Sequence, residues 1–201
     1  MPLAPEADLR SIVPILRPSL SEQPPTIQVE RISPKTSPQA RHGTLSARYG
    51  LGPFPLHTER AHWRSPPRYL IFRSVGEVTD RPTTLLDSYA LKADKKLVQE
   101  LLETQWIVQW GDDSFRSPVL TPLPTPEQWQ IRYDRCCMSL SEDAPPELNV
   151  RLDQTFDSLI PEHHFWRLGE ILLIDNWRML HGRGTSAVED FGRVLERIVV
   201  P

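Results

Sequence analysis

The sequence has little cysteine, no long apolar run and no concentration of basic residues. Its two cysteines, Cys136 and Cys137, are adjacent, which gives neither a disulfide framework nor a zinc-type spacing. No apolar stretch approaches the roughly 20 residues of a membrane helix. Acidic and basic residues are mixed along the chain, with a net charge of −3, so there is no basic stripe for nucleic acid. These absences predict a soluble protein of a reducing compartment, without a membrane or nucleic-acid partner.

The N-terminal residues also lack the charged, apolar and small-residue order of a signal peptide. We therefore expect a cytoplasmic protein. Residues 1–25 are rich in proline and weakly patterned, which favours an arm that either wraps the sheet or is partly disordered. The remaining residues, 26–201, are long enough for one domain with a substantial core.

Proline, by contrast, is abundant, with 21 residues gathered between short apolar segments. Regularly spaced apolar segments between such breakers are typical of all-β proteins. One clear helix is expected over 87–105, with Asp87 or Ser88 as its N-cap, and a weaker one over 146–159. The pattern predicts an all-β sandwich or jelly roll with helical insertions. The expected strands are 26–32, 54–59, 68–75, 83–87, 106–110, 128–140, 170–176 and 193–200.

The segment FPLHTERAHWRSPPRYLIF places a histidine and a glutamate two residues apart. If it is a strand, His57 and Glu59 point to the same face. The pair is either an accidental surface pair or part of a metal site that needs a third ligand. His181 ends the segment LGEILLIDNWRMLHGRG, where a histidine is also common as a solvated strand end.

Two histidines and one carboxylate together are the set that holds Fe(II) on one face and leaves coordination positions open. Such a site needs an anionic co-substrate and therefore a positive partner. Arg193, on the expected returning strand, supplies a planar fork suited to a carboxylate. The other four histidines, His42, His62, His163 and His164, are expected in surface or supporting positions.

Three blocks resemble the taurine dioxygenase-like Fe(II)/2-oxoglutarate-dependent oxygenases over roughly residues 45–200. HTERAHWRSPPRYLIF is similar to the family's His-Thr-Asp block, and DRPTTLLDSYAL to its Gly-Gly-x-Thr-x-x-x-Asp block. GEILLIDNWRMLHGR with FGRVLERIVV resembles its distal histidine and arginine block. The resemblance implies a double-stranded β-helix, a jelly-roll variant, that uses Fe(II), 2-oxoglutarate and O2 to hydroxylate or desaturate a small substrate.

The resemblance also implies roles for individual residues. It makes His57, Glu59 and His181 the iron ligands, and Thr83, Arg193 and Arg197 the 2-oxoglutarate-binding residues, with Thr84 as the alternative to Thr83. Four further residues are candidates for a substrate pocket, although tryptophan is more often core and Arg132 suits a structural ion pair. These four are His62, Trp63, Arg132 and Trp177.

Three departures from the family pattern shape these expectations. Glutamate replaces the usual aspartate, as in the clavaminate synthase-like branch, which favours an amino-acid-like substrate. A carboxylate of either kind at this position favours hydroxylation or desaturation over halogenation. Asp80 and Arg81 stand where the family has paired glycines, which makes Thr83 less secure. The chain is also short, which predicts an open active site or a lid supplied by a second copy in a homodimer.

The sequence leaves three alternatives open. The first is a cupin-like metal protein that works without 2-oxoglutarate, and Thr83 and Arg193 argue against it. The second is a non-catalytic member of the fold that keeps the ligand-binding residues. The third is an all-β protein in which the matching blocks are coincidental.

Overall fold

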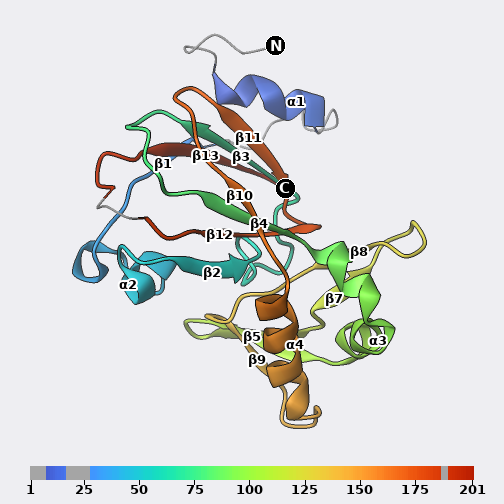
Figure 1. Ribbon diagram of the computed structural model, residues 1–201. Coiled ribbons are helices and arrows are strands. Elements are labelled where there is room, and N and C mark those ends of the chain that lie inside the picture. The colour runs from blue at the N-terminus through green and yellow to red at the C-terminus, as the bar shows by residue number, and fades with distance from the viewer. Residues whose placement is uncertain (1–7, 17–27, 187–189) are drawn as a thin grey trace.

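Two four-stranded antiparallel sheets face each other at the centre of the molecule (Figure 1). The computed structural model describes residues 8–16, 28–186 and 190–201. The first sheet has the order β1-β13-β3-β11 and the second the order β10-β4-β12-β2. The first contains β1 (Glu30–Ile32), β13 (Leu195–Val200), β3 (Tyr69–Ser74) and β11 (Ile171–Asp175). The second contains β10 (Glu162–His164), β4 (Thr83–Asp87), β12 (Met179–Arg183) and β2 (Phe54–His57).

The facing sides of the two sheets enclose one apolar cluster. Because side chains alternate along a strand, every second residue of β3, β11 and β13 reaches this interior. The interior face also carries polar residues at one end. Arg197 of β13 lies there, between Phe72 of β3 and Glu30 of β1. The buried apolar residues of the cluster are Leu70, Phe72, Leu85, Trp166, Ile174 and Leu195.

The outer side of the first sheet is covered by the N-terminal segment. A 3-10 helix (Leu9–Ile12) and the short α1 (Val13–Leu16) place Leu9 and Val13 against Ile71, Ile198 and Val200. Figure 1 shows α1 above this sheet. Residues 8–16 therefore lie on the sheet, while the rest of the expected arm, 1–7 and 17–25, lies outside the described residues.

The outer side of the second sheet is covered by a layer of helices and hairpins (Figure 1). Leu86 of β4 and Leu180 of β12 join its core, which is the largest apolar cluster among the described residues. The layer consists of α3 (Lys95–Glu103), α4 (Glu147–Ser158), β5 (Trp106–Trp110), β6 (Asp113–Ser117), β7 (Leu120–Pro122), β8 (Trp129–Ile131) and β9 (Met138–Leu140). Three further short helices are Ser37–Gln39, α2 (Leu45–Tyr49) and Ser88–Ala93.

The structure confirms the predicted all-β jelly roll with helical insertions and corrects several boundaries. The expected helix over 87–105 is divided, because Asp94 leaves helical geometry and caps α3 through its carboxylate. Asp87, one of the two expected caps, accepts from the backbone N–H of Tyr89 at 2.9 Å. The expected strand 128–140 is two strands, β8 and β9, joined by a turn. The sequence pattern did not predict β6, β7, β10 or β12, which are short or largely polar.

Two expected absences can be compared with the structure. Cys136 and Cys137 are both free, so they do not pair with each other. Among the described helices, none combines the length and apolar character needed to cross a bilayer.

Leu152→Ala should destabilise the helical layer without touching the facing sheets. Leu152 of α4 is fully buried, and truncating a buried leucine to alanine removes packing and leaves a cavity. We expect a loss of about 2–5 kcal/mol in the free energy of unfolding. Urea denaturation followed by circular dichroism measures it. Val150→Ala, on the same helix but 54% exposed, is the matched control and should change stability by less than about 0.5 kcal/mol. Equal effects in the two variants would contradict the packing assignment.

Candidate metal centre

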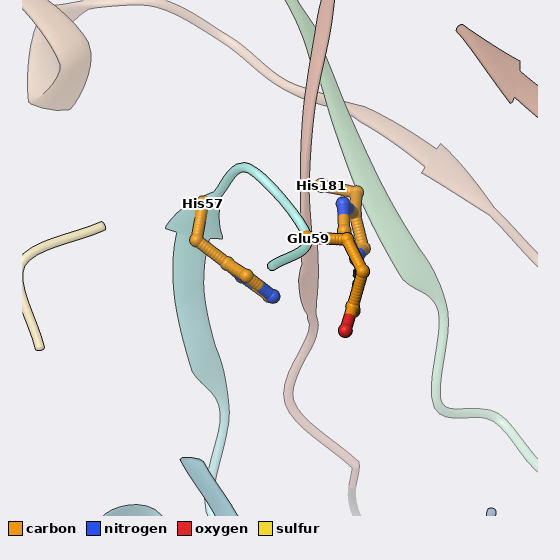
Figure 2. Close-up of side chains that lie close together, drawn as sticks. All are labelled: His57, Glu59 and His181. Atoms are coloured by element: carbon orange, nitrogen blue, oxygen red, sulfur yellow. Dashed lines mark ion pairs between the residues drawn. The ribbon is translucent and has the colours of Figure 1, made fainter. Parts of the chain in front are cut away.

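Three side chains from two separate parts of the chain converge between the sheets. One ligand atom each of His57, Glu59 and His181 lies within 4.8 Å of the other two. Figure 2 shows His57 at the end of β2, Glu59 on the loop that follows, and His181 on β12. All three are largely buried, with exposed fractions of 6%, 9% and 6%. A buried carboxylate beside two histidines is a donor set that fits a divalent transition metal.

The segment that carries His57 and Glu59 is shorter as a strand than expected. β2 ends at His57, and the chain turns sharply after Glu59, where Arg60 has a φ of +56°. The alternation of side chains nevertheless continues through Thr58. Thr58 is fully buried and donates its backbone N–H to the carbonyl of Tyr133 at 2.7 Å. Because Thr58 is held on one side of this segment, His57 and Glu59 lie together on the opposite side.

The register of β12 fixes His181 opposite His57. The two residues are cross-strand partners, and their ring centroids are 4.4 Å apart. Gly182 makes this pairing close, because a Cβ there would lie 2.7 Å from the carbonyl oxygen of Phe54. Only a residue without a side chain lets β12 and β2 approach so closely, so Gly182 supports the position of both histidines.

Asn176 holds the backbone of Glu59 in place. Its side-chain oxygen accepts from the Glu59 N–H at 2.8 Å, and its amide group donates to the carbonyls of Glu59 and Pro67 at 3.2 and 2.8 Å. Asn176 is fully buried. Sequence reasoning missed this residue; the available signal was a polar residue at the end of the apolar run ILLIDN.

The tautomer of His57 is set by its own strand. Nδ1 lies 3.0 Å from the carbonyl oxygen of Pro55, which can only accept, so Nδ1 carries the proton. Nε2 is then left with a free lone pair for a metal, and a backbone carbonyl is a usual partner for the other nitrogen of a metal-binding histidine. His181 Nδ1 is buried without a partner in the described structure.

The charges around the carboxylate keep it ionised. Burial alone would raise the pKa of Glu59, but the Arg197 guanidinium and then the two histidines hold it well below its usual range. Arg197 Nη1 lies 2.6 Å from Glu59 Oε2, and His181 Nε2 lies 3.7 Å from the same oxygen. Burial, followed by the nearby His57, lowers the pKa of His181 to about 4, so its ring is neutral at pH 7.

Thr83 and Arg183 share the interior face with His181. Thr83 is the cross-strand partner of Arg183, two residues from the Leu85–His181 pair, and its hydroxyl accepts from the Trp166 indole N–H at 3.0 Å. Thr84 instead lies opposite Gly182, on the other face. Of the two expected alternatives, the structure therefore places Thr83 with the candidate ligands.

Arg193 lies just before β13, not on it as expected, since that strand begins at Leu195. Its guanidinium is buried and its Nε has no hydrogen-bond partner in the described structure. Burial lowers the pKa of Arg193 to about 10, with Asp190 acting in the opposite direction. Asp190 is already engaged by Arg81, whose Nε donates to it at 2.7 Å. An unpaired buried guanidinium nitrogen is an arrangement suited to an anion.

The four residues expected in a substrate pocket have other contacts. His62 stacks on Trp110 with centroids 4.0 Å apart, and Trp63 is 40% exposed beside Arg60. Trp177 donates its indole N–H to the carbonyl of Pro66 and lines a different small pocket, with Tyr89 and Trp129 among its walls. Their substrate role stays a prediction.

Arg132 was expected to form a structural ion pair, but it has none with the residues that the structure describes. Its guanidinium donates to the backbone carbonyls of Ala61, Trp63 and Arg64, with 2.5 Å to Trp63 and 2.9 Å to Arg64. It therefore ties together the loop that follows Glu59. Burial lowers the pKa of Arg132 to about 10.

The fold is shared with several solved structures, among them two oxygenases that contain iron. An asparagine oxygenase in complex with Fe(II), hydroxyasparagine and succinate superposes with a TM-score of 0.69 over 86% of this chain and 56% of that chain, at 18% identity. The oxygenase OrfP in complex with Fe and alpha-ketoglutaric acid gives 0.66 over 86% and 56%, at 22% identity. The PvcB protein from Pseudomonas aeruginosa gives 0.62 over 86% and 63%, at 18% identity.

These similarities establish the fold. The chain spans 56–63% of the length of these three structures. No protein-family model matches the chain, and no curated protein matches it either.

Asn176→Ala should weaken binding of a divalent metal by about 10- to 100-fold, because the Glu59 backbone loses the side chain that holds it. Calorimetric titration with Mn(II), which does not oxidise during the measurement, gives the affinity. Asn149→Ala, at an exposed position of α4, is the control and should bind as the unaltered protein does. If Asn176→Ala binds Mn(II) with unchanged affinity, the Glu59 loop holds its geometry without this side chain.

Proposed function

We propose that this protein is an Fe(II)/2-oxoglutarate-dependent dioxygenase that hydroxylates a C–H bond of a small, amino-acid-like substrate. The observation that carries the proposal is the buried cluster of His57, Glu59 and His181 between the two sheets of a jelly roll. Two histidines and one carboxylate bind Fe(II) on one side and leave positions for a co-substrate and O2.

The residues present fit such a metal. The hydrogen bond from His57 Nδ1 to Pro55 presents Nε2 as a donor, and His181 is uncharged at neutral pH. Glu59 supplies the anionic oxygen, and Asn176 fixes the backbone from which it extends. A carboxylate at this position also favours hydroxylation over halogenation, because iron halogenases lack this carboxylate and bind chloride in its place.

Arg193 and Thr83 are the residues that would hold 2-oxoglutarate. The buried and incompletely paired Arg193 guanidinium suits the carboxylate far from the metal, and the Thr83 hydroxyl lies on the interior face that carries His181. The three guanidinium groups of Arg81, Arg183 and Arg193 influence one another electrostatically, and Asp190 is the acidic group among them. The net positive charge there favours an anion.

When bound, Fe(II) and 2-oxoglutarate would supply the oxidising power: O2 is divided between succinate and the substrate hydroxyl, with release of CO2. The protein's contribution is positional. Thr58 and Asn176 fix the loop that carries Glu59, while the facing sheets exclude bulk water from the ligands. Desaturation of the same C–H position is the alternative outcome.

The amino-acid-like substrate is proposed by analogy with the solved structures. One of them contains hydroxyasparagine, and OrfP was solved with hydroxylated arginine. The glutamate in place of aspartate agrees with this substrate class. We also propose a cytoplasmic location and a homodimer in which the second copy closes the site. The specific similarity to the taurine dioxygenase-like family is part of the proposal as well.

Anaerobic addition of Fe(II) and 2-oxoglutarate should produce the weak visible charge-transfer band of a keto acid chelated to iron. His181→Ala should lose the band because one of the three ligands is removed. His42→Ala, which changes an exposed histidine, is the control and should keep it. If iron-loaded protein shows no band and calorimetry detects no 2-oxoglutarate, the cupin-like or non-catalytic alternative is favoured.

Arg193→Ala should weaken 2-oxoglutarate binding by about 10- to 100-fold, because a charge-assisted contact to a buried carboxylate is lost. Metal affinity should stay unchanged, which calorimetry with Mn(II) checks separately. Arg167→Ala removes an exposed arginine and serves as the control. Unchanged 2-oxoglutarate affinity in Arg193→Ala would show that another residue receives the far carboxylate.

A further inference from the structure

Arg197 contacts the same oxygen of Glu59 that faces His181. Its Nη1 lies 2.6 Å from Glu59 Oε2, and His181 Nε2 lies 3.7 Å from that atom. The other oxygen, Oε1, lies 3.5 Å from Arg60 Nε. The Glu59 oxygen that faces His181 is therefore already paired with a guanidinium.

A second carboxylate holds Arg197 from the other side. Glu30 of β1 lies opposite Arg197 of β13, and its Oε2 accepts from Arg197 Nε at 3.0 Å and from Nη2 at 2.5 Å. Glu30 Oε1 also accepts from Arg60 Nη2 at 3.0 Å. Glu30 and Glu59 thus share both arginines, and these four side chains together carry no net charge.

We propose that Arg197 is an internal counter-cation, which a divalent metal must displace from Glu59, and that Glu30 receives it. This inference rests on the metal site of the proposed function. It assigns positioning roles to Glu30 and Arg197 that are distinct from a direct contact with co-substrate.

The physical reason is competition between two cations for one buried oxygen. Without metal, Arg197 compensates the charge of Glu59, which would otherwise be costly to bury. A divalent ion on the same oxygen would repel the guanidinium at short range, where little water screens the interaction. Glu30 offsets this repulsion because it already accepts two hydrogen bonds from Arg197 and can retain the side chain as its contact with Glu59 weakens.

This arrangement predicts opposite effects from two substitutions that break the same network. Arg197→Met keeps the length of the side chain and removes the competing charge, so metal affinity should increase by about tenfold, which corresponds to about 1.4 kcal/mol. Glu30→Gln removes the receiving charge and leaves both arginines to repel the metal, so affinity should fall by about three- to tenfold. A purely structural role would weaken metal binding in both variants.

Mn(II) titration followed by calorimetry, on the full chain without 2-oxoglutarate, is the experiment. Arg197→Lys keeps the charge and should stay within about threefold of the unaltered protein. Glu196→Gln is the matched control for Glu30→Gln. Glu196 is a neighbouring carboxylate on β13 whose partners are Arg31 and Arg73 rather than Arg60 and Arg197, so its loss should leave Mn(II) affinity unchanged. Thermal unfolding checks that each variant is folded.

Tighter binding in Arg197→Met together with weaker binding in Glu30→Gln supports the inference. If Arg197→Met does not fold, weaker binding in Glu30→Gln with unchanged binding in Arg197→Lys and Glu196→Gln supports it. Weaker or unchanged binding in folded Arg197→Met, or unchanged binding in Glu30→Gln, overturns it while the metal site stands. If neither the unaltered protein nor Arg197→Met binds Mn(II), both the inference and the proposed metal site fail.

Discussion

Burying the carboxylate of Glu59 between two sheets is the constraint on which the rest of the site depends. A buried carboxylate is tolerated only with a compensating charge and satisfied hydrogen bonds. The compensation comes from the first sheet, where β13 supplies Arg197, whereas the histidines come from the second sheet. The site therefore forms only when the two sheets pack face to face, which makes assembly of the jelly roll and assembly of the ligand set the same event.

The outer faces of the sheets explain why this packing is stable. The first sheet buries Ile71 and Ile198 under the N-terminal helical segment, and the second buries Leu86 and Leu180 under the helical layer. Each sheet thus buries apolar residues on both of its sides, and the candidate ligands lie between the two sheets. Substitutions in the outer layers should therefore change stability, while substitutions at Asn176, Glu30 or Arg197 should act on the candidate ligands.

Much of the candidate site could be predicted from the sequence because its signals are local. His57 and Glu59 are two residues apart, and the short-range alternation of strands is enough to place them together. The prediction assumed a strand over 54–59, whereas β2 ends at His57, and the alternation of side chains nevertheless persists through Thr58. His181 was found through residue chemistry and the resemblance to a family, since β12 has too few apolar residues to be recognised as a strand.

The remaining contacts could not be predicted because they depend on tertiary structure. Asn176 reaches Glu59 across 117 positions of the sequence, and Glu30 reaches Arg197 across 167. Nothing in the local pattern of either segment specifies these partners. Arg132 illustrates the same limit, because its residue type suggested an ion pair whereas its location gives it three backbone carbonyls.

The charges of the site also suggest an order in which its parts become occupied. Glu30, Glu59, Arg60 and Arg197 balance one another, so a divalent metal would add two positive charges to a neutral buried cluster. Arg193 presents a further buried guanidinium, whose Nε has no partner among the described residues. On the proposed function, a dianion such as 2-oxoglutarate would neutralise the charge brought by the metal and would also pair with that nitrogen. In that case metal binding would strengthen anion binding, and the proposed displacement of Arg197 by the metal would precede binding of the co-substrate.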